Sequence, residues 1–274
     1  MDSSSFQKRF TFATNLIQEA GEIALGYFRR LDSLVVKSKG HQDMASQADL
    51  NTEIFIRDRL KNQFPEDAFL GEETGRTEIG ETRGIWVVDP IDGTQPFIGG
   101  LGSWCVSIAY LVDHILQMGF VYSPARKELF AGGVQQQATL NGTPIRVSSA
   151  TDLTGGIVGV GYSPRVKPDD FLQVFSKLLQ RGGMFYREGS GALTLCYVAS
   201  GSLIGYVEQH INSWDCLGAL AIIQAAGGKT NDFLANDGLW NGNRLIAGPA
   251  PLYPTLESFF DCTIFDLPAA PPGL

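Results

Sequence analysis

Cysteine and histidine are scarce in this sequence of 274 residues, which contains four cysteines and three histidines. The cysteines lie far apart in apolar surroundings and form no C-x-x-C pair: Cys105, Cys196, Cys216 and Cys262. This spacing argues against a disulfide framework and against a zinc site. It favours free, buried thiols in a reducing compartment.

Long hydrophobic runs and an excess of positive charge are also lacking. No apolar stretch approaches the ~18 residues that a membrane span needs, and the N-terminal MDSSSFQKRF has no hydrophobic signal-peptide core. The formal net charge of −8 argues against binding to a nucleic acid polymer or to an anionic membrane. We therefore expect a cytoplasmic protein, in which an anionic substrate would need help from a metal ion.

The sequence is that of a globular protein, and its pattern of predicted helices and strands changes near residue 150. Hydrophobic residues make up 44% of the chain, enough for a sizeable core. Residues 1–148 combine amphipathic helices with strand-like runs and an Asn141-Gly142 hairpin turn, which predicts helices packed on an antiparallel sheet. Residues 149–274 alternate strand and helix patterns, which predicts an α/β half. The expected fold is therefore mixed α+β and α/β, with one domain on each side of the boundary.

Several helices are predicted with definite limits. A stripe of apolar residues at spacings of three and four marks a first helix that ends near Arg30: Phe6, Phe10, Ala13, Ile17, Ala20, Ala24 and Tyr27. A helix is predicted from about Pro168 to Gln180. Another is predicted in SWDCLGALAIIQAAGG, with Gly227 and Gly228 as its C-terminal cap.

The stretch IWVVDPIDGTQPF, residues 85–97, combines a buried strand with two carboxylates. Val88 ends the apolar run, and Pro90 predicts a bend that turns Asp89 and Asp92 into one pocket. Carboxylate and carbonyl oxygens are the ligands that hard divalent cations prefer. Pro96 suits the first turn of a helix, whose free N–H groups would bind an anion. The alternative is a polar turn with an aspartate as a helix cap.

Further carboxylates occur at three other places in the chain. Glu72 and Glu73 follow a predicted strand at residues 68–70, Asp43 and Asp49 lie near the start of a second helix, and Asp215 lies in the first turn of the last predicted helix. Capping is the usual role of Asp at such positions, and adjacent glutamates in a loop are commonly only solvated. On these residues alone, a purely structural role and a role in a metal site both stay open.

Three motifs together give the sequence a resemblance to a known family. GEET spans residues 71–74, WVVDPIDGT spans residues 86–94, and SWDCLGALAIIQAAGG spans residues 213–228. In this order, and over nearly the whole chain, they resemble the inositol monophosphatase family of Mg²⁺-dependent, lithium-sensitive phosphatases. The resemblance implies a layered αβαβα sandwich, the hydrolysis of phosphoric monoesters and a homodimer.

The resemblance implies two or three Mg²⁺ ions. Glu72, Asp89 and the carbonyl of Ile91 would hold the first ion. Asp89, Asp92 and Asp215 would hold the second, and Glu72 would also contact a weaker third ion. Asp89 would thus bridge two ions.

The resemblance also implies how phosphate and water are handled. The phosphate would contact the metals and the backbone N–H groups of Gly93 and Thr94. Thr94, hydrogen-bonded to Asp49, would orient and help to deprotonate a metal-bound water, so Asp49, Glu72 and Thr94 form the implied catalytic set. A metal ion lowers the pKa of bound water from about 15.7 toward neutrality, and no side-chain nucleophile is needed.

A separate group of residues would recognise the substrate's alcohol. The implied substrate contacts are Asp92, Arg187, Gly189, Ser190, Gly191, Glu208 and Asp215. The turn before residue 192 could equally be a helix start, and Glu208 could be a surface residue at a strand end. Arg187 could bind a second anionic group or only pair with Glu188.

The sequence departs from the family pattern in the loop after the central motif. Pro96 stands where the family commonly has Asn, and Gly99 and Gly102 replace bulkier residues; Ser46 stands for a Thr before Asp49. These changes leave the predicted metal ligands intact. They alter the expected rigidity of the loop and access to the site.

Two other classes of function share some features with this sequence. Haloacid-dehalogenase phosphatases use D-x-D-G-T with a nucleophilic aspartate, and the extra residue between Asp89 and Asp92 does not fit that spacing. A catalytically silent binding module is the non-enzymatic alternative, and the full set of carboxylates argues against it.

Within the enzyme class, inositol 1-phosphate is the favoured substrate, because Glu208 and a small turn offer hydroxyl contacts without a dense basic pocket. Histidinol phosphate is the alternative. Fructose 1,6-bisphosphate and 3′-phosphoadenosine 5′-phosphate are less favoured, because a second phosphate would need more than Arg187.

Overall fold

The computed structural model describes residues 1–31, 36–38, 44–76 and 84–260. Asp43 and Cys262 lie outside these ranges. The helices are α1 (Ser3–Phe28), α2 (Gln47–Gln63), α3 (Thr94–Ile98), α4 (Pro168–Gln180), α5 (Gly191–Ala199), α6 (Ser213–Ala225), α7 (Gly238–Asn241) and α8 (Tyr253–Glu257). The strands are β1 (Val36–Ser38), β2 (Met44–Ser46), β3 (Ala68–Gly71), β4 (Gly75–Arg76), β5 (Gly84–Asp92), β6 (Cys105–Val112), β7 (Ile115–Ser123), β8 (Glu128–Gly133), β9 (Gln136–Leu140), β10 (Thr143–Pro144), β11 (Ile157–Val160), β12 (Met184–Tyr186), β13 (Gly205–Ile211), β14 (Lys229–Thr230) and β15 (Asn243–Gly248).

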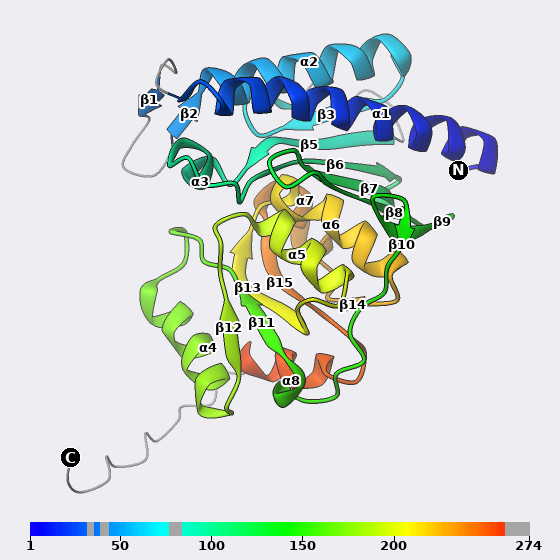
Figure 1. Cartoon of the computed structure of the whole chain (residues 1–274). Helices are drawn as coiled ribbons and strands as arrows, with labels where there is room; N and C mark the ends of the chain where they lie inside the picture. Colours follow the sequence, from blue (N-terminus) through cyan, green and yellow to red (C-terminus); the bar gives the residue numbers. More distant parts are fainter. Residues whose placement is uncertain (32–35, 39–43, 77–83, 261–274) are drawn as a thin grey trace, which may run out of the picture.

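The elements stack in alternating layers of helix and sheet (Figure 1). Helices α1 and α2 cover the outer face of an eight-stranded sheet with the order β10-β9-β8-β7-β6-β5-β3-β4. Helices α5 and α6 separate this sheet from a five-stranded sheet with the order β12-β11-β13-β15-β14, and α4 and α8 lie on the far side. The predicted layered αβαβα sandwich is confirmed.

The outer helix layer follows the predicted apolar stripe. Phe6, Ala13 and Ile17 of α1 are buried in one cluster with Trp86 and Phe120 of the sheet. The helix ends at residue 28, close to the predicted end at residue 30. An apolar stripe of this kind buries one helix face and leaves the other face to solvent.

The larger sheet is mostly antiparallel. Its one parallel pair among the described strands is β3 with β5, which sets Leu70 opposite Val87. The predicted hairpin turn joins β9 to β10, where Asn141 and Gly142 have φ values of +50° and +78°. Both residues therefore adopt the left-handed conformation that a tight two-residue turn requires.

The middle layer packs unusually close to the larger sheet. A Cβ on Gly119 of β7 would lie 2.0 Å from the carbonyl oxygen of Gly218 in α6, and a Cβ on Gly218 would lie 2.7 Å from Ser107 Oγ. Only glycine permits this approach, which brings the first turn of α6 toward β5. The helix ends as predicted, because Gly227 has a φ of +84° just after it.

The smaller sheet is mixed, since β11 runs parallel to β12 and β13 while β13 runs antiparallel to β15. Helix α4 has the predicted limits, and its Val174 and Leu178 share a buried cluster with Leu256 and Phe259.

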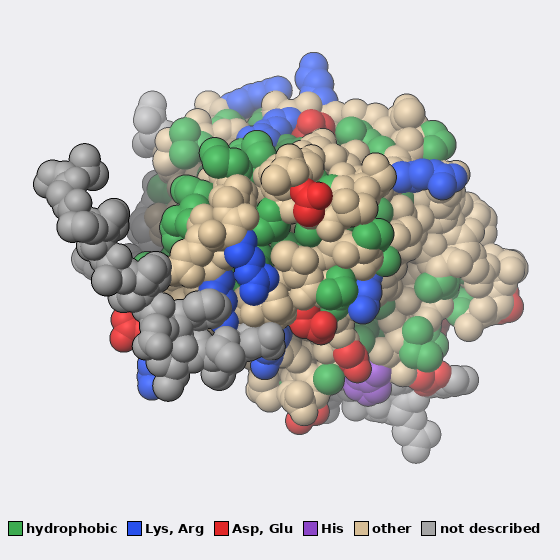
Figure 2. All heavy atoms as spheres, turned by 90° about the horizontal axis from the view of Figure 1, so that it is seen from below, with side chains coloured by type: hydrophobic (Ala, Val, Ile, Leu, Met, Phe, Trp, Pro, Cys, Tyr) green, Lys and Arg blue, Asp and Glu red, His purple; other side chains and the backbone are tan. Residues whose placement is uncertain are grey.

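The face seen in Figure 2 carries Lys and Arg side chains interspersed with Asp and Glu. No helix in the described ranges is both long enough and apolar enough to cross a membrane.

Candidate active site

The two aspartates of the central motif lie in a β-bulge at the end of β5. Asp89 is paired with Ser107 of β6, and Asp92 is paired with Cys105. Three residue intervals along β5 are therefore matched by only two along β6. The prediction that the chain leaves the strand in a bend at this point is wrong, because β5 continues through Asp92 and the irregularity is a bulge after which pairing with β6 resumes. A bulge re-aims side chains without ending the strand.

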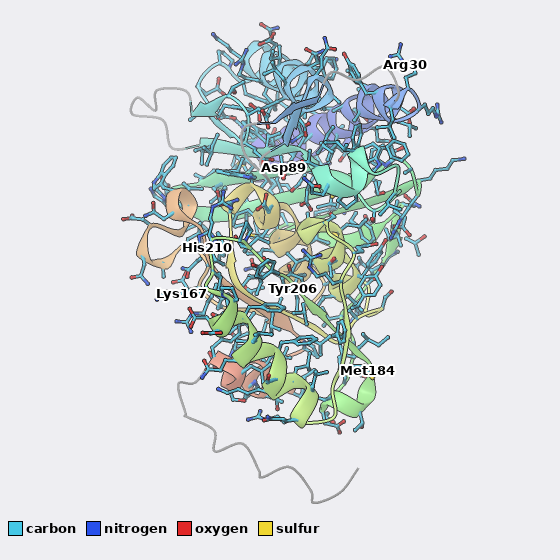
Figure 3. The ribbon with its side chains drawn as sticks, turned by 90° about the vertical axis from the view of Figure 1, so that its left-hand side faces the viewer. Arg30, Asp89, Lys167, Met184, Tyr206 and His210 are labelled. Atoms are coloured by element: carbon cyan, nitrogen blue, oxygen red, sulfur yellow. The ribbon has the colours of Figure 1, made fainter. Side chains whose placement is uncertain are left out.

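Carboxylates from three separate elements meet at this bulge. Glu72 follows β3, Asp89 belongs to β5, and Asp215 lies in the first turn of α6. Each offers an oxygen atom, and these oxygens all lie within 4.8 Å of one another. Figure 3 shows Asp89 where the larger sheet meets the middle helix layer. Oxygens at this separation can share one divalent cation.

The electrostatics of this cluster favour a cation. Burial raises the pKa of Asp89 well above its usual value, and the negative charges of Glu72 and Asp92 raise it further. Desolvation by the surrounding protein raises the pKa of Glu72 well above its usual value, and the charges of Asp215 and Asp49 add to the shift, although this side chain keeps contact with solvent. Ionised carboxylates that repel one another in this way fit a divalent ion, which would offset their charge.

Asp92 connects the bulge to the start of α5. Its Oδ2 accepts hydrogen bonds from Ser190 Oγ at 2.6 Å and from the Ala192 N–H at 2.7 Å, and its Oδ1 accepts one from the Gly191 N–H at 3.3 Å. Burial, together with the charge of Asp215, raises the pKa of Asp92 to about 7, and these hydrogen bonds oppose the shift. A carboxylate oxygen has two lone pairs, so Oδ1 retains the capacity to bind an ion.

Glu53 of α2 holds the loop that carries Glu72. The sequence motifs did not predict this role for Glu53. Its carboxylate accepts hydrogen bonds from the N–H groups of Glu73 at 2.8 Å and Thr74 at 2.7 Å, and the residue is fully buried. A Cβ on Gly71 would lie 2.4 Å from Glu53 Cδ. The available signal was the spacing of four residues between Asp49 and Glu53, which puts both on one face of α2.

The residues predicted to handle water lie beside this loop. Asp49 is buried in the first turn of α2, and its charge contributes to the raised pKa of Glu72. Thr94 begins α3, and its hydroxyl donates to the carbonyl oxygen of Ile91 at 3.3 Å. The predicted hydrogen bond between Thr94 and Asp49 stays a prediction.

A pocket next to the carboxylates is lined by all seven predicted substrate contacts. Glu208 of β13 is buried, so the alternative that it is a surface residue is wrong. Its Oε2 accepts a hydrogen bond from Tyr206 OH at 2.6 Å, and burial raises its pKa to about 8. The lining residues are Asp92, Val160, Gly161, Tyr162, Arg187, Gly189, Ser190, Gly191, Thr194, Tyr206, Glu208, Ile211 and Asp215.

The turn before α5 is fixed from both halves of the molecule. Ser190 caps α5 by accepting the N–H of Leu193 at 3.2 Å, so it is at once a helix start and a pocket residue. Glu188 pairs with Arg126 at 2.5 Å. Arg187 is exposed at the edge of the pocket.

The fold is an αβαβα sandwich, with a carboxylate cluster at a strand bulge beside a pocket that contains a buried glutamate. These features together are typical of a class of metal-dependent phosphatases. The model of the inositol monophosphatase family matches residues 6–258, and the chain belongs to this family of phosphatase enzymes.

Relatives and solved structures agree with this assignment. "Nus factor SuhB" of Haemophilus influenzae is 33% identical over 241 residues, which cover 87% of this chain and 90% of the relative. The inositol monophosphatase structure from Anabaena (Nostoc) sp. PCC 7120 has a TM-score of 0.80 at 28% identity, covering 93% of this chain and 96% of that one. The structure of SaIMPase-II with bound inositol monophosphate has a TM-score of 0.75 at 27% identity, covering 92% of each chain.

Proposed function

We propose that the protein hydrolyses polyol monophosphates with Mg²⁺ as its cofactor, and that inositol 1-phosphate is the favoured substrate. The observation that carries the proposal is the cluster of Glu72, Asp89 and Asp215 oxygens within 4.8 Å. A pocket containing the buried Glu208 adjoins this cluster through Asp215. In this proposal the metal ligands and the residue that accepts substrate hydroxyls are therefore neighbours.

The carboxylates divide among two ions in this proposal. Glu72, Asp89 and the Ile91 carbonyl would hold the first, and Asp89, Asp92 and Asp215 would hold the second, while Glu72 would also contact a weaker third ion. When bound, Mg²⁺ supplies charge neutralisation for the phosphate and a lowered pKa for the attacking water. The mutual repulsion that raises the pKa of Asp89 and Glu72 supports this assignment.

The first turn after the bulge receives the phosphate in this proposal. Gly93 has a φ of +95° and precedes α3, where the N–H groups of Gly93 and Thr94 would donate to phosphate oxygens. The Thr94 hydroxyl, which donates to the Ile91 carbonyl in this structure, would turn to donate to Asp49 and would accept a hydrogen bond from the attacking water. Asp49 would take up the proton of the water through Thr94 as the new phosphorus–oxygen bond forms. The phosphorus–oxygen bond to the alcohol would break, and the departing alkoxide would take a proton from a second water.

The alcohol is recognised in the adjoining pocket. Glu208 accepts hydrogen bonds from substrate hydroxyls, and the Gly189-Ser190-Gly191 turn leaves room for them. A relative that binds inositol monophosphate supports this choice. Histidinol phosphate is the second candidate, and Arg187 at the pocket edge is the residue that would contact a further anionic group.

A substrate panel tests the proposal. Phosphate release with Mg²⁺ is measured on inositol 1-phosphate, histidinol phosphate, fructose 1,6-bisphosphate and 3′-phosphoadenosine 5′-phosphate. We expect the highest kcat/KM on inositol 1-phosphate. A hundredfold preference for histidinol phosphate, about 2.7 kcal/mol of transition-state stabilisation, would contradict the substrate choice. Release from none of the four would favour the silent binding module.

Assembly and location complete the proposal. Family resemblance supports a homodimer, and light scattering coupled to size-exclusion chromatography would report twice the mass of the chain. The described cysteines Cys105, Cys196 and Cys216 are free and buried, which supports a reducing compartment such as the cytoplasm. The boundary between residues 148 and 149 stays a prediction.

A further inference from the structure

Arg126 links the larger sheet to the segment that precedes α5. It lies in the turn between β7 and β8, and its Nη2 forms an ion pair with Glu188 Oε2 at 2.5 Å. Its Nη1 donates a hydrogen bond to Tyr197 OH of α5, and that hydroxyl donates to Glu128 Oε2 at 2.9 Å. The planar fork of the guanidinium therefore contacts both α5 and the residues just before it.

Glu188 is a buried carboxylate that depends on this ion pair. Its side chain is 8% exposed, and its Oε2 also accepts a hydrogen bond from Tyr186 OH at 2.9 Å. Its backbone carbonyl accepts a hydrogen bond from Ser103 Oγ at 3.1 Å. Its Oε1 is buried and has no hydrogen-bond partner among the described residues. A buried charge that loses its partner is strongly destabilised, whereas removal of both charges costs much less, so loss of Arg126 should displace Glu188 toward solvent.

The two residues that follow Glu188 are held against the candidate active site. Gly189 has a φ of +97°, and a Cβ on it would lie 2.7 Å from Pro96 Cγ of α3. Ser190 Oγ donates to Asp92 Oδ2 at 2.6 Å. Because these residues are packed this closely, a displaced Glu188 would disturb both the wall of the pocket and the hydrogen bond on Asp92.

The effect of Arg126 on the pocket is indirect. Gly189, Ser190 and Gly191 line the pocket, whereas Arg126 and Glu188 are not among its described lining residues. We propose that Arg126 is a positioning residue that acts through Glu188 and holds the turn at residues 189–191 in the shape that receives the substrate's alcohol. The inference rests on the proposed phosphatase function and adds to it a residue outside the pocket. Since this turn does not hold the proposed attacking water, its displacement should raise KM more than it lowers kcat.

The test measures phosphate release at saturating Mg²⁺ from the ester of the substrate panel with the highest wild-type kcat/KM. Arg126→Ala leaves the charge of Glu188 unpaired, the double variant Arg126→Ala/Glu188→Gln removes both charges, and Arg126→Lys keeps a cation without the fork. Arg59→Ala is the matched control. Arg59 also pairs with a glutamate, Glu19, and lies over an aromatic ring, that of Phe55, but it belongs to the outer helix layer.

We expect Arg126→Ala to raise KM by about tenfold and to change kcat by less than about threefold. In the double variant KM should return to within about threefold of the wild-type value, because no unpaired buried charge remains. Arg126→Lys should fall between the wild type and Arg126→Ala. Arg59→Ala should match the wild type.

Several outcomes would overturn the role of Arg126. A double variant whose KM is as high as that of Arg126→Ala, or higher, would show that the arginine does not act through Glu188. An unchanged KM in Arg126→Ala would have the same force, even with a lower kcat, since a fall in kcat alone reports loss of folded enzyme. An equal rise of KM in Arg59→Ala would also overturn it. A wild type that releases no phosphate from any ester of the panel would instead overturn the phosphatase proposal on which the role rests.

Discussion

Asp92 is the residue that joins the fold to the candidate site most directly. Its Oδ2 holds the start of α5 through Ser190 and Ala192, while its Oδ1 accepts only the long bond from Gly191. One carboxylate therefore fixes the start of the helix that contributes to the pocket wall, and in the proposed assignment it would also hold an ion. Replacing one oxygen of Asp92 would therefore alter both the packing of α5 and the chemistry of the proposed site.

Individual site residues differ in how far the sequence could predict them. The family resemblance implied that Glu72, Asp89 and Asp215 share one site, and their oxygens lie within 4.8 Å of one another. Their local positions at strand ends and at a helix start left capping and solvation open as alternatives. The sequence left the burial of Glu208 open, because that burial depends on Tyr206 and on the distant Gly161, where a Cβ would lie 2.2 Å from Glu208 Oε2. Contacts of this kind have no local signal.

The role of Asp49 is testable at the residue scale. We expect Asp49→Asn to lower kcat by more than about tenfold, because the amide cannot take up a proton from the attacking water. The Mg²⁺ concentration for half-maximal activity should change by less than about threefold, because Asp49 is not among the proposed ligands. Steady-state kinetics at several Mg²⁺ concentrations measure both quantities.

Asp58 provides the control, since it lies on an exposed part of the same helix beside Arg57. Asp58→Asn should leave kcat and the Mg²⁺ dependence as in the wild type. If Asp49→Asn also retained the wild-type kcat, Asp49 would be only a helix cap.

At the scale of elements, the helices were more predictable than the strand that carries the site. Helix periodicity and the Pro and Gly signals gave the limits of α4 and α6 because these features are local. The bulge in β5 was missed because Pro90 indicates a bend locally, whereas the pairing of Asp92 with Cys105 comes from a separate strand. Register between strands is set by tertiary contacts.

Helix α2 should control metal binding through Glu53. We expect Glu53→Gln to raise the Mg²⁺ concentration for half-maximal activity several-fold and to leave kcat at saturating Mg²⁺ within about threefold, because an amide retains only one acceptor for two backbone donors. Glu53→Ala should show a larger shift and a loss of roughly 2–3 kcal/mol in the free energy of unfolding, since two partly buried N–H groups lose their partner. Mg²⁺ titrations and urea unfolding measure these effects.

Glu19 is a suitable control for Glu53, because it is an exposed glutamate that pairs with Arg59 on the surface. Glu19→Gln should change the free energy of unfolding by less than about 1 kcal/mol and leave the Mg²⁺ dependence unaltered. A Glu53→Gln enzyme with wild-type Mg²⁺ dependence would show that Glu53 does not position the loop after β3.

At the scale of the whole molecule, the site connects the two sheets. Glu72 and Asp89 come from the larger sheet, and Asp215 comes from the middle helix layer, which also packs against the smaller sheet (Figure 1). Repulsion among these carboxylates opposes that assembly when no cation is bound. Binding of an ion to the folded state should therefore stabilise the whole protein.

The metal-free protein should lose stability as the pH rises. The pKa of Asp92 is raised from 3.8 to about 7 and that of Glu208 from 4.5 to about 8, so the folded state binds more protons than the unfolded state in this range. Their contribution is fully present below pH ~4 and is lost between about pH 4 and pH 8. We expect Tm in EDTA to fall by roughly 5 °C or more from pH 5 to pH 8.

Mg²⁺ should reverse this trend, because its carboxylate ligands must be ionised to bind it. The rise in Tm on adding Mg²⁺ should be larger at pH 8 than at pH 5, as scanning calorimetry can measure. Equal stabilisation at both pH values would speak against a carboxylate site for the ion.

The central claim is that Asp89 holds the ions that make this protein a phosphatase, and phosphate release from inositol 1-phosphate by the wild type and Asp89→Asn tests it most directly. We predict Mg²⁺-dependent release by the wild type and a loss of roughly a thousandfold or more in Asp89→Asn, with the fold intact by circular dichroism. The variant should also be more stable than the wild type in EDTA, because the raised pKa of Asp89 reflects a destabilising charge. Release by folded Asp89→Asn at the wild-type rate would contradict the account.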